Sequence, residues 1–353
     1  AANARDIQAK LKGMAASGAV ELAAQPAEEP IMPLVVDAAG RTRDVPYTVD
    51  LQARDDVSAA IEKGMNAVRE LGAGTPGVIS PHGAYDDATA ALLQEHNPAY
   101  ATFSDRVVKA VSGASTEALT ATSAAALRPY LVSTSKTSKL PVLFCSDALS
   151  TELTVVAAAA PATVFGDRVR QMAASARAAQ PADGILLLCM DINALSLQRS
   201  DRSAVLDHLS SVLSSGSDLD VTTPKEYLRR HPARLQAYGF QAASDVGGFD
   251  LWMGSANQAS LWTTLDDARK ALRSQAGGRR SEAQTALLRA ESNRWFSALS
   301  LPQPRAATER ALSQYRSAIT QIYRAADLAV PAALAPVKWE RSTPISSPKA
   351  AGS

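Results

Sequence analysis

The sequence predicts an α/β protein in which a mostly parallel sheet is followed by a domain of helices. Two observations support this fold class: short continuous apolar runs alternate with helical patterns up to about residue 230, and only helical periodicity follows. Continuous apolar strands separated by helices indicate a parallel sheet that is covered on both faces. The strands are expected at 19–23, 32–36, 77–80, 100–102, 142–145 and 185–190, with a short one at 220–222.

Helices are expected between these strands and throughout the last third of the chain. They are expected near 3–14, 54–71, 85–94, 161–179 and 203–213. From Trp262 onward, apolar residues recur at helical spacing up to about residue 326. We therefore expect an α/β part over residues 1–240, a helical domain over 241–339 and a flexible tail, rich in Ser, Pro, Lys and Gly, over 340–353.

The charge pattern excludes two classes of partner. The 353 residues carry a formal net charge of +1, with acidic and basic residues interspersed. A nucleic-acid-binding or membrane-surface protein concentrates Lys and Arg on one face, so neither partner is expected. The apolar runs are too short to span a bilayer. No cofactor is expected either.

One turn places a histidine where α/β barrels place their chemistry. Residues 77–85 read as a short apolar strand that runs into a Pro/Gly turn, and a helix opened by acidic residues follows. Residues just past the carboxyl end of a barrel strand line the active site. His82 occupies that place, with Asp86 four residues on. The pair can act as acid and base, or His82 can be an ordinary loop residue with its hydrogen bonds satisfied.

The two cysteines lie in matching contexts. Cys145 and Cys189 each end an apolar run and each precede an aspartate by two residues, Asp147 and Asp191. A dithiol or metal site at the edge of the sheet is one interpretation. The favoured one is two buried cysteines that behave as small hydrophobic residues, because zinc sites show tighter Cys/His spacing, so no metal is expected. A disulfide requires Cα atoms within about 7 Å, which the sequence leaves open.

Six segments match, in order, the motifs of one enzyme family. They are 17–34 with its Pro30-Ile31-Met32-Pro33-Leu34 run, 77–85 with Ser80-Pro81-His82-Gly83, 140–150, 185–194, 249–254 together with Trp262, and 289–296. The set resembles glycoside hydrolase family 57, the α-glucan hydrolases and transferases of the amylopullulanase and branching-enzyme type. The resemblance covers roughly residues 5–337 and implies an incomplete (β/α)7-type barrel followed by a C-terminal helical domain.

The departures from the family motifs predict a loss of catalysis. The family uses two carboxylates that face each other across the glycosidic bond. The resemblance puts His82 at the nucleophile position and keeps an acid, Asp191, at the acid/base position. An imidazole cannot form the same glycosyl ester and stabilises an oxocarbenium ion poorly. We therefore expect a non-catalytic protein that serves as a carbohydrate-binding or assembly component, or purely as a structural scaffold.

The resemblance also implies a set of substrate-binding residues. They are Trp252, Trp262, Trp295 and Asp147. Trp252, Trp262 and Trp295 can stack on sugar rings, but the helical spacing of Trp262 and Trp295 favours the core of a helical domain. The expected ligand is an α-glucan or another polysaccharide.

Two further expectations follow from the resemblance. In the alternative function, the chain is an α-glucan hydrolase or glucanotransferase in which Asp191 is the acid/base and Asp86 or Asp147 replaces the nucleophile. The first strands of the family have no counterpart in this sequence, which predicts an open sheet edge near Val20 or Met32. A protein partner or a separate N-terminal fragment is expected to cover that edge.

Overall fold

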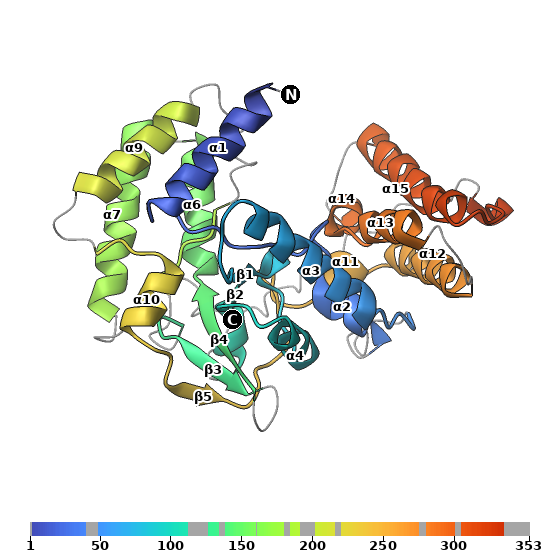
Figure 1. Cartoon of the computed structure of the whole chain (residues 1–353), viewed down its shortest axis with the longest axis horizontal. Helices are drawn as coiled ribbons and strands as arrows, with labels where there is room; N and C mark the ends of the chain where they lie inside the picture. The colour runs from blue at the N-terminus through green and yellow to red at the C-terminus, as the bar shows by residue number, and fades with distance from the viewer. Residues whose placement is uncertain are drawn as a thin grey trace, which may run out of the picture. The chain divides into compact units, whose positions relative to one another are not determined.

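A five-stranded sheet organises the first of two units into which the chain divides (Figure 1). Unit 1 comprises residues 1–36 and 53–249, and unit 2 comprises residues 37–52 and 250–353. The computed structural model describes residues 2–39, 49–111, 126–133, 138–159, 161–179, 184–190, 202–215, 220–274, 280–300 and 305–334. The predicted tail, 340–353, lies outside these ranges. No described helix is long and apolar enough to cross a membrane.

The strands of the sheet follow the order β1-β2-β4-β3-β5. They are β1 (Val78–Ile79), β2 (Ala101–Ser104), β3 (Tyr130–Ser133), β4 (Lys139–Cys145) and β5 (Leu235–Ala237). The pairings β1–β2, β2–β4 and β3–β5 are parallel, and only β3–β4 is antiparallel among the named strands. The predicted mostly parallel sheet is therefore confirmed.

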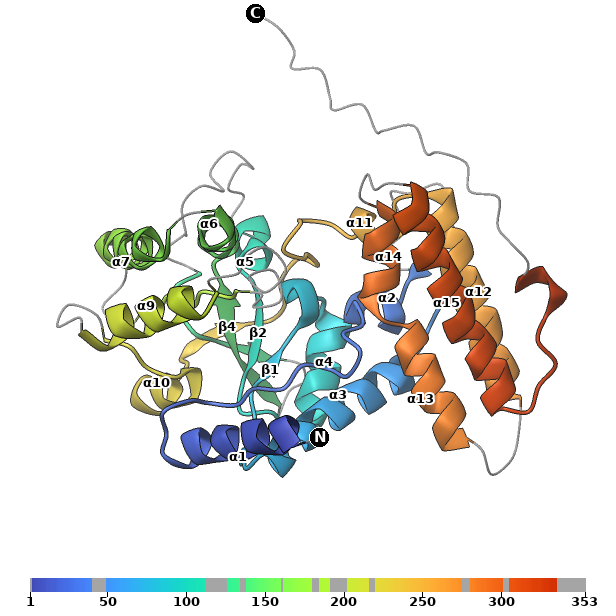
Figure 2. The same ribbon diagram turned by 90° about the horizontal axis from the view of Figure 1, so that it is seen from above.

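Helices cover both faces of the sheet, which explains why its central strands are largely buried. All four residues of β2 are buried. In Figure 2, α3 and α4 lie on one side of β1, β2 and β4, and α6, α7 and α9 lie on the other. A cluster of buried side chains joins α6, α7 and α9. The helices of unit 1 are α1 (Ala2–Ala16), α2 (Met32–Val36), α3 (Arg54–Glu70), α4 (Asp87–Glu95), α5 (Arg106–Val111), α6 (Asp147–Ala159), α7 (Ala162–Ala179), α9 (Arg202–Ser215) and α10 (Pro224–Arg230).

The strand predicted at 32–36 is wrong, because these residues form helix α2. All five side chains are buried, and a short run of buried apolar residues fits either a strand or a helix. Pro33 stands in the first turn, where a helix does not need its missing N–H. The expected open edge at Met32 is therefore wrong as well.

Other predicted strands are reduced to single contacts. Residues 19–23 form no named strand, but Ala24 pairs with the outer side of β1 through two backbone hydrogen bonds of 2.8 Å. In the segment 184–190, Leu187 pairs in parallel with Cys145 at the end of β4. Residues 220–222 form no strand, and β3 and β5 were not predicted.

The protein partner or fragment that was expected to cover a sheet edge stays a prediction.

Unit 2 is built of helices, as the periodicity of the last third predicted. They are α11 (Asp250–Met253), α12 (Ala256–Arg273), α13 (Arg280–Ala290), α14 (Asn293–Ser300), α15 (Arg305–Ala325) and the 3-10 turn η4 (Ala332–Leu334). Helix α15 packs against α12, α13 and α14. Residues 37–52 are grouped with this unit, and Val49 and Leu51 are buried.

Candidate functional site

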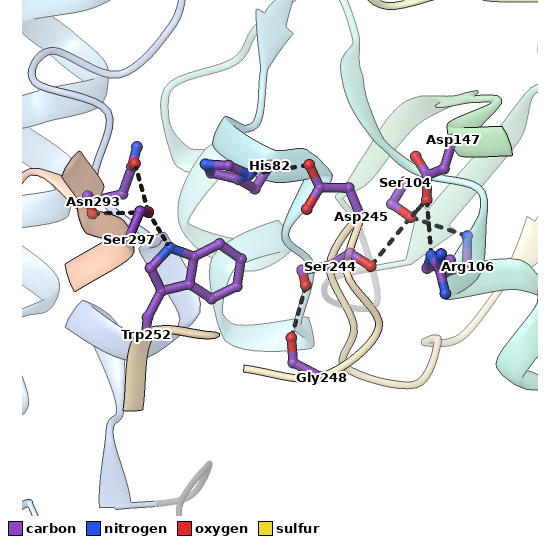
Figure 3. A network of polar contacts seen from close by, with 10 residues as sticks. All are labelled: His82, Ser104, Arg106, Asp147, Ser244, Asp245, Gly248, Trp252, Asn293 and Ser297. Atoms are coloured by element: carbon purple, nitrogen blue, oxygen red, sulfur yellow. Dashed lines mark hydrogen bonds and ion pairs between the residues drawn. The ribbon is translucent and has the colours of Figure 1, made fainter. Parts of the chain in front are cut away.

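Polar side chains gather where the parallel strands β1, β2 and β4 end (Figure 3). His82 follows β1, Ser104 is the last residue of β2, and Asp147 begins α6 directly after β4. The carboxyl ends of parallel strands meet at one edge of a sheet, so residues far apart in sequence come together there. We call the residues His82, Ser104, Arg106, Asp147 and Asp245 the strand-end cluster.

His82 lies in a turn that is held against the neighbouring strand. The turn η2 spans Pro81–Gly83, and both His82 and Gly83 have left-handed backbones with φ of 54°. A Cβ on Gly83 would lie 2.5 Å from the backbone nitrogen of Ser104, so only glycine fits this close approach. The chain therefore presents the His82 ring from a turn seated on the end of β2.

Asp245 holds His82 by two hydrogen bonds. Its backbone N–H donates to the His82 carbonyl at 2.9 Å, and its Oδ2 lies 3.0 Å from His82 Nδ1. The two side chains are 32% and 37% exposed. Ser244 and Gly247 close a tight turn through reciprocal backbone hydrogen bonds of 2.9 Å, and this turn positions Asp245. His82 is thus paired with Asp245, and its predicted pairing with Asp86 stays a prediction.

Asp147 is the most buried carboxylate of the strand-end cluster, with a side chain 10% exposed. Its Oδ2 accepts a hydrogen bond from the Ser104 hydroxyl and lies 3.4 Å from Arg106 Nε. Burial raises the pKa of Asp147 from 3.8 to about 7, and the nearby carboxylates of Asp105 and Asp245 add to the rise. The Ser104 hydroxyl and Arg106 oppose it. The Asp147 carboxyl is therefore about half protonated at neutral pH.

The two cysteines form a disulfide with Cα atoms 5.8 Å apart. The expectation of two separate small hydrophobic residues is wrong. Pairing of Leu187 with Cys145, together with the Ser146 N–H that donates to the Leu187 carbonyl at 3.0 Å, places the two segments side by side. No group of three or more His, Cys, Asp or Glu residues in the described ranges could hold a metal ion.

Of the other two predicted acids, Asp86 lies within the described residues and Asp191 lies outside them. Asp86 is 1% exposed and caps α4, where its Oδ1 accepts from the Thr89 N–H at 2.6 Å. A carboxylate committed to a helix N-terminus is poorly suited to replace a nucleophile.

The three predicted tryptophans lie in unit 2 and are buried. Trp252 and Trp262 are 0% exposed and Trp295 is 7% exposed. Trp252 Nε1 donates to Ser297 Oγ at 2.9 Å (Figure 3), and Trp262 Nε1 donates to the Trp252 carbonyl at 2.9 Å. The Trp262 ring stacks on Phe296 with centroids 3.9 Å apart. Burial favours the core role for these rings, and the sugar-binding role stays a prediction.

The sequence analysis missed three members of the strand-end cluster. Ser104 ends β2 and Arg106 follows two residues later, in the same relation as Cys145 and Asp147 at the end of β4, and this pattern was available as a signal. Asp245 is 163 residues from His82, and no sequence pattern connects the two. Only the fold places Asp245 beside the turn of His82.

Comparison with known proteins identifies relatives at the level of family and fold. The family model described as Glycosyl hydrolase family 57 matches residues 2–238. No curated protein matches the sequence.

Several solved structures share the fold. A branching enzyme from Thermococcus kodakaraensis, in complex with glucose, aligns with a TM-score of 0.67 at 14% identity over 92% of this chain and 69% of its own. A branching enzyme from Pyrococcus horikoshii gives 0.65 at 13% identity, over 91% and 72%. A 4-α-glucanotransferase from Thermococcus litoralis gives 0.62 at 15% identity over 91% of this chain, which spans 50% of that enzyme. The likeness confirms the predicted fold class.

Proposed function

Because this chain belongs to glycosyl hydrolase family 57, as its motifs predicted, we propose that it binds an α-glucan at the strand-end cluster without cleaving it. The solved enzymes of the same fold include a 4-α-glucanotransferase and branching enzymes. In α/β barrels, ligands bind at the carboxyl ends of the strands, where this cluster lies. Membership of the family supports an α-glucan as the ligand, and the position of the cluster at the strand ends supports binding there.

The proposal that the chain does not cleave glucan rests on the identity of residue 82, which is a histidine. In the family mechanism, a carboxylate at this position attacks the anomeric carbon and forms a glycosyl ester. Here an imidazole stands there, with Nδ1 hydrogen-bonded to Asp245 at 3.0 Å. An imidazole carries no negative charge with which to stabilise an oxocarbenium ion. Asp245, the nearby acid, is itself engaged with the ring.

Polar groups of the cluster remain accessible for sugar hydroxyls. The side chains of His82, Arg106 and Asp245 are 32%, 30% and 37% exposed. Guanidinium N–H groups donate to hydroxyl oxygens, and a carboxylate accepts from hydroxyl groups. The cluster therefore offers both partners that a sugar hydroxyl needs.

Calorimetric titration with maltoheptaose, combined with an assay for new reducing ends, tests the proposal. The wild-type chain should bind saturably and release no reducing ends above a blank. Arg106→Ala should weaken binding about tenfold, which corresponds to about 1.4 kcal/mol. His231→Ala is the control, because His231 stacks on Tyr227 at the end of α10 and takes no part in the cluster. Absence of binding, or turnover that Asp191→Ala abolishes, would overturn it.

A hydrolase or glucanotransferase is the second candidate, and the protonation of Asp147 favours one form of it. A carboxyl group with a pKa of about 7 suits a proton donor near neutral pH and is a weak nucleophile while protonated. Its Oδ2 is also held by Ser104 and Arg106. Any turnover should therefore use Asp147 as an acid, should fall as the pH rises through 7, and should be lost in Asp147→Asn.

A further inference from the structure

The Cys145–Cys189 disulfide is fixed within the backbone of the strand-end cluster. Cys145 is the last residue of β4, and its carbonyl accepts from the Asp105 N–H at 3.0 Å. The Asp105 carboxylate in turn lies 3.4 Å from the Asp147 N–H. The disulfide therefore lies two residues from Asp147 and shares a hydrogen-bonded path with it.

The segment 184–190 carries Cys189, the other cysteine of the disulfide. All seven residues are only partly buried. Within the described part of the chain, its hydrogen bonds join Ile185 N–H to the Leu127 carbonyl at 2.7 Å, Ser146 N–H to the Leu187 carbonyl at 3.0 Å, and Cys189 N–H to Ser150 Oγ at 2.9 Å. Ser146 directly follows Cys145, and Cys189 is itself part of the disulfide, so the hydrogen bonds of Ser146 and Cys189 both lie beside the disulfide.

The disulfide joins β4 to a segment that directly precedes Asp191 in the sequence. The residue that follows the segment is Asp191, which the family motif matches to the acid/base position. Leu188 and Met190 pack, half-buried, against the cluster formed by α6, α7 and α9. One end of the disulfide therefore lies at the end of β4, two residues before Asp147, and the other end lies in the segment that leads to Asp191.

We propose that this disulfide controls the ligand site: the oxidised form holds 184–190 against β4 and binds glucan, and reduction releases the segment and weakens binding. This inference rests on the proposed function. Reduction consumes a dithiol: two electrons and two protons pass to the sulfurs of Cys145 and Cys189, which become thiols, and the dithiol becomes a disulfide. Cys189 is partly exposed, which gives a reductant access. The binding form is then the one that persists in an oxidising compartment.

Comparison of the oxidised and dithiothreitol-reduced wild-type chain tests this. The chain has two cysteines, so thiol titration of unfolded samples should count none before reduction and two after it. Amide exchange measured by mass spectrometry should become at least tenfold faster at Ser146 and Cys189 after reduction. It should stay unchanged at Val78, whose N–H donates to the Tyr100 carbonyl at 2.8 Å. The affinity for maltoheptaose should fall at least tenfold.

The double substitution Cys145→Ser with Cys189→Ser supplies the matched control. It should behave like the reduced chain and should not respond to dithiothreitol. If it fails to fold, the reduced wild-type chain provides the same comparison. Equal exchange and equal affinity in both redox states, or two free thiols in the purified native protein, would overturn the inference. Faster exchange at Ser146 and Cys189 with no glucan binding by either form would overturn the proposed function and leave the fastening role supported.

Discussion

The strand-end cluster of unit 1 and the tryptophan core of unit 2 differ in burial: His82 and Asp245 of the cluster are partly exposed, whereas Trp252, Trp262 and Trp295 are buried. In unit 2 the aromatic side chains form part of the core: Trp262 is buried, stacks on Phe296 and donates a hydrogen bond to the Trp252 carbonyl. In unit 1 His82 lies in the turn η2 and is 32% exposed, and the proposed function sets it at the family's nucleophile position. A tryptophan of unit 2 is fixed by packing, whereas His82 in unit 1 is held mainly by its hydrogen bonds to Asp245.

This difference separates two constraints on a sequence. A buried ring is held by its volume and by one N–H donor, so its replacement costs stability whatever the protein does. An exposed strand-end residue contributes little to packing, and its identity can change at little cost to the fold. A substitution at such a position can therefore change the chemistry of a site while the fold is kept.

Removal of a tryptophan should give the largest effect on stability. Trp262→Ala should lower the free energy of unfolding by about 4 kcal/mol, because it deletes a fully buried ring and leaves a cavity. All four tryptophans lie beyond residue 249, so their fluorescence in a urea titration reports on unit 2. Tyr238→Ala is the control, since that ring is 85% exposed. A loss below about 1 kcal/mol would mean that the Trp262 ring is not packed as core.

The matching test in unit 1 depends on pH. The folded chain keeps Asp147 protonated up to about pH 7, whereas the unfolded chain ionises it near 3.8, so folded stability falls as the pH rises between these values. Asp147→Asn removes this loss and keeps an oxygen for Ser104. Its advantage over wild type should be near zero below pH 4 and should reach at most about 4 kcal/mol above pH 7.

Denaturant titrations at pH 4 and pH 8 measure this difference, and the pH 4 pair serves as the internal control. An equal effect of Asp147→Asn at both pH values would show that burial does not raise the pKa of Asp147. The two regions would then not differ in how their contribution to stability depends on pH.

Two serine substitutions give the smallest and most closely matched effects. Ser297→Ala removes the acceptor of Trp252 Nε1 and should cost about 1 kcal/mol at every pH. Ser104→Ala removes a hydrogen bond that lowers the pKa of Asp147, so that pKa should rise and the destabilisation should grow above pH 7. The titrations at pH 4 and pH 8 check both. A pH-dependent Ser297→Ala or a pH-independent Ser104→Ala would contradict the distinction.

Much of the fold could be predicted from the sequence because the central strands are buried on both faces. Residues 142–145 form a continuous apolar run and lie at the carboxyl end of β4. The same rule failed at 32–36, where burial on all sides belongs to a short helix. Strand β5 has only three residues, two of them exposed, so it has no local signature and depends on its pairing with β3.

The candidate site was less accessible to sequence reasoning. His82 and Asp147 could be found because each follows an apolar strand. Asp245 could not, since it reaches His82 through a turn far along the chain. The disulfide also depended on a distance, the Cα separation of Cys145 and Cys189, which is set by the pairing of two segments and not by their composition.

The left-handed turn at residues 82 and 83 determines which mutational routes are open at this position. Position 83 is closed to every other amino acid, because any Cβ there would collide with the backbone of Ser104. Position 82 can vary, at a cost of about 1–2 kcal/mol for most side chains in a left-handed backbone. A library that tests which residues at position 82 support glucan cleavage should therefore leave Gly83 fixed and randomise residue 82 together with Asp245, because a glutamate at 82 would face the carboxylate that now holds the imidazole.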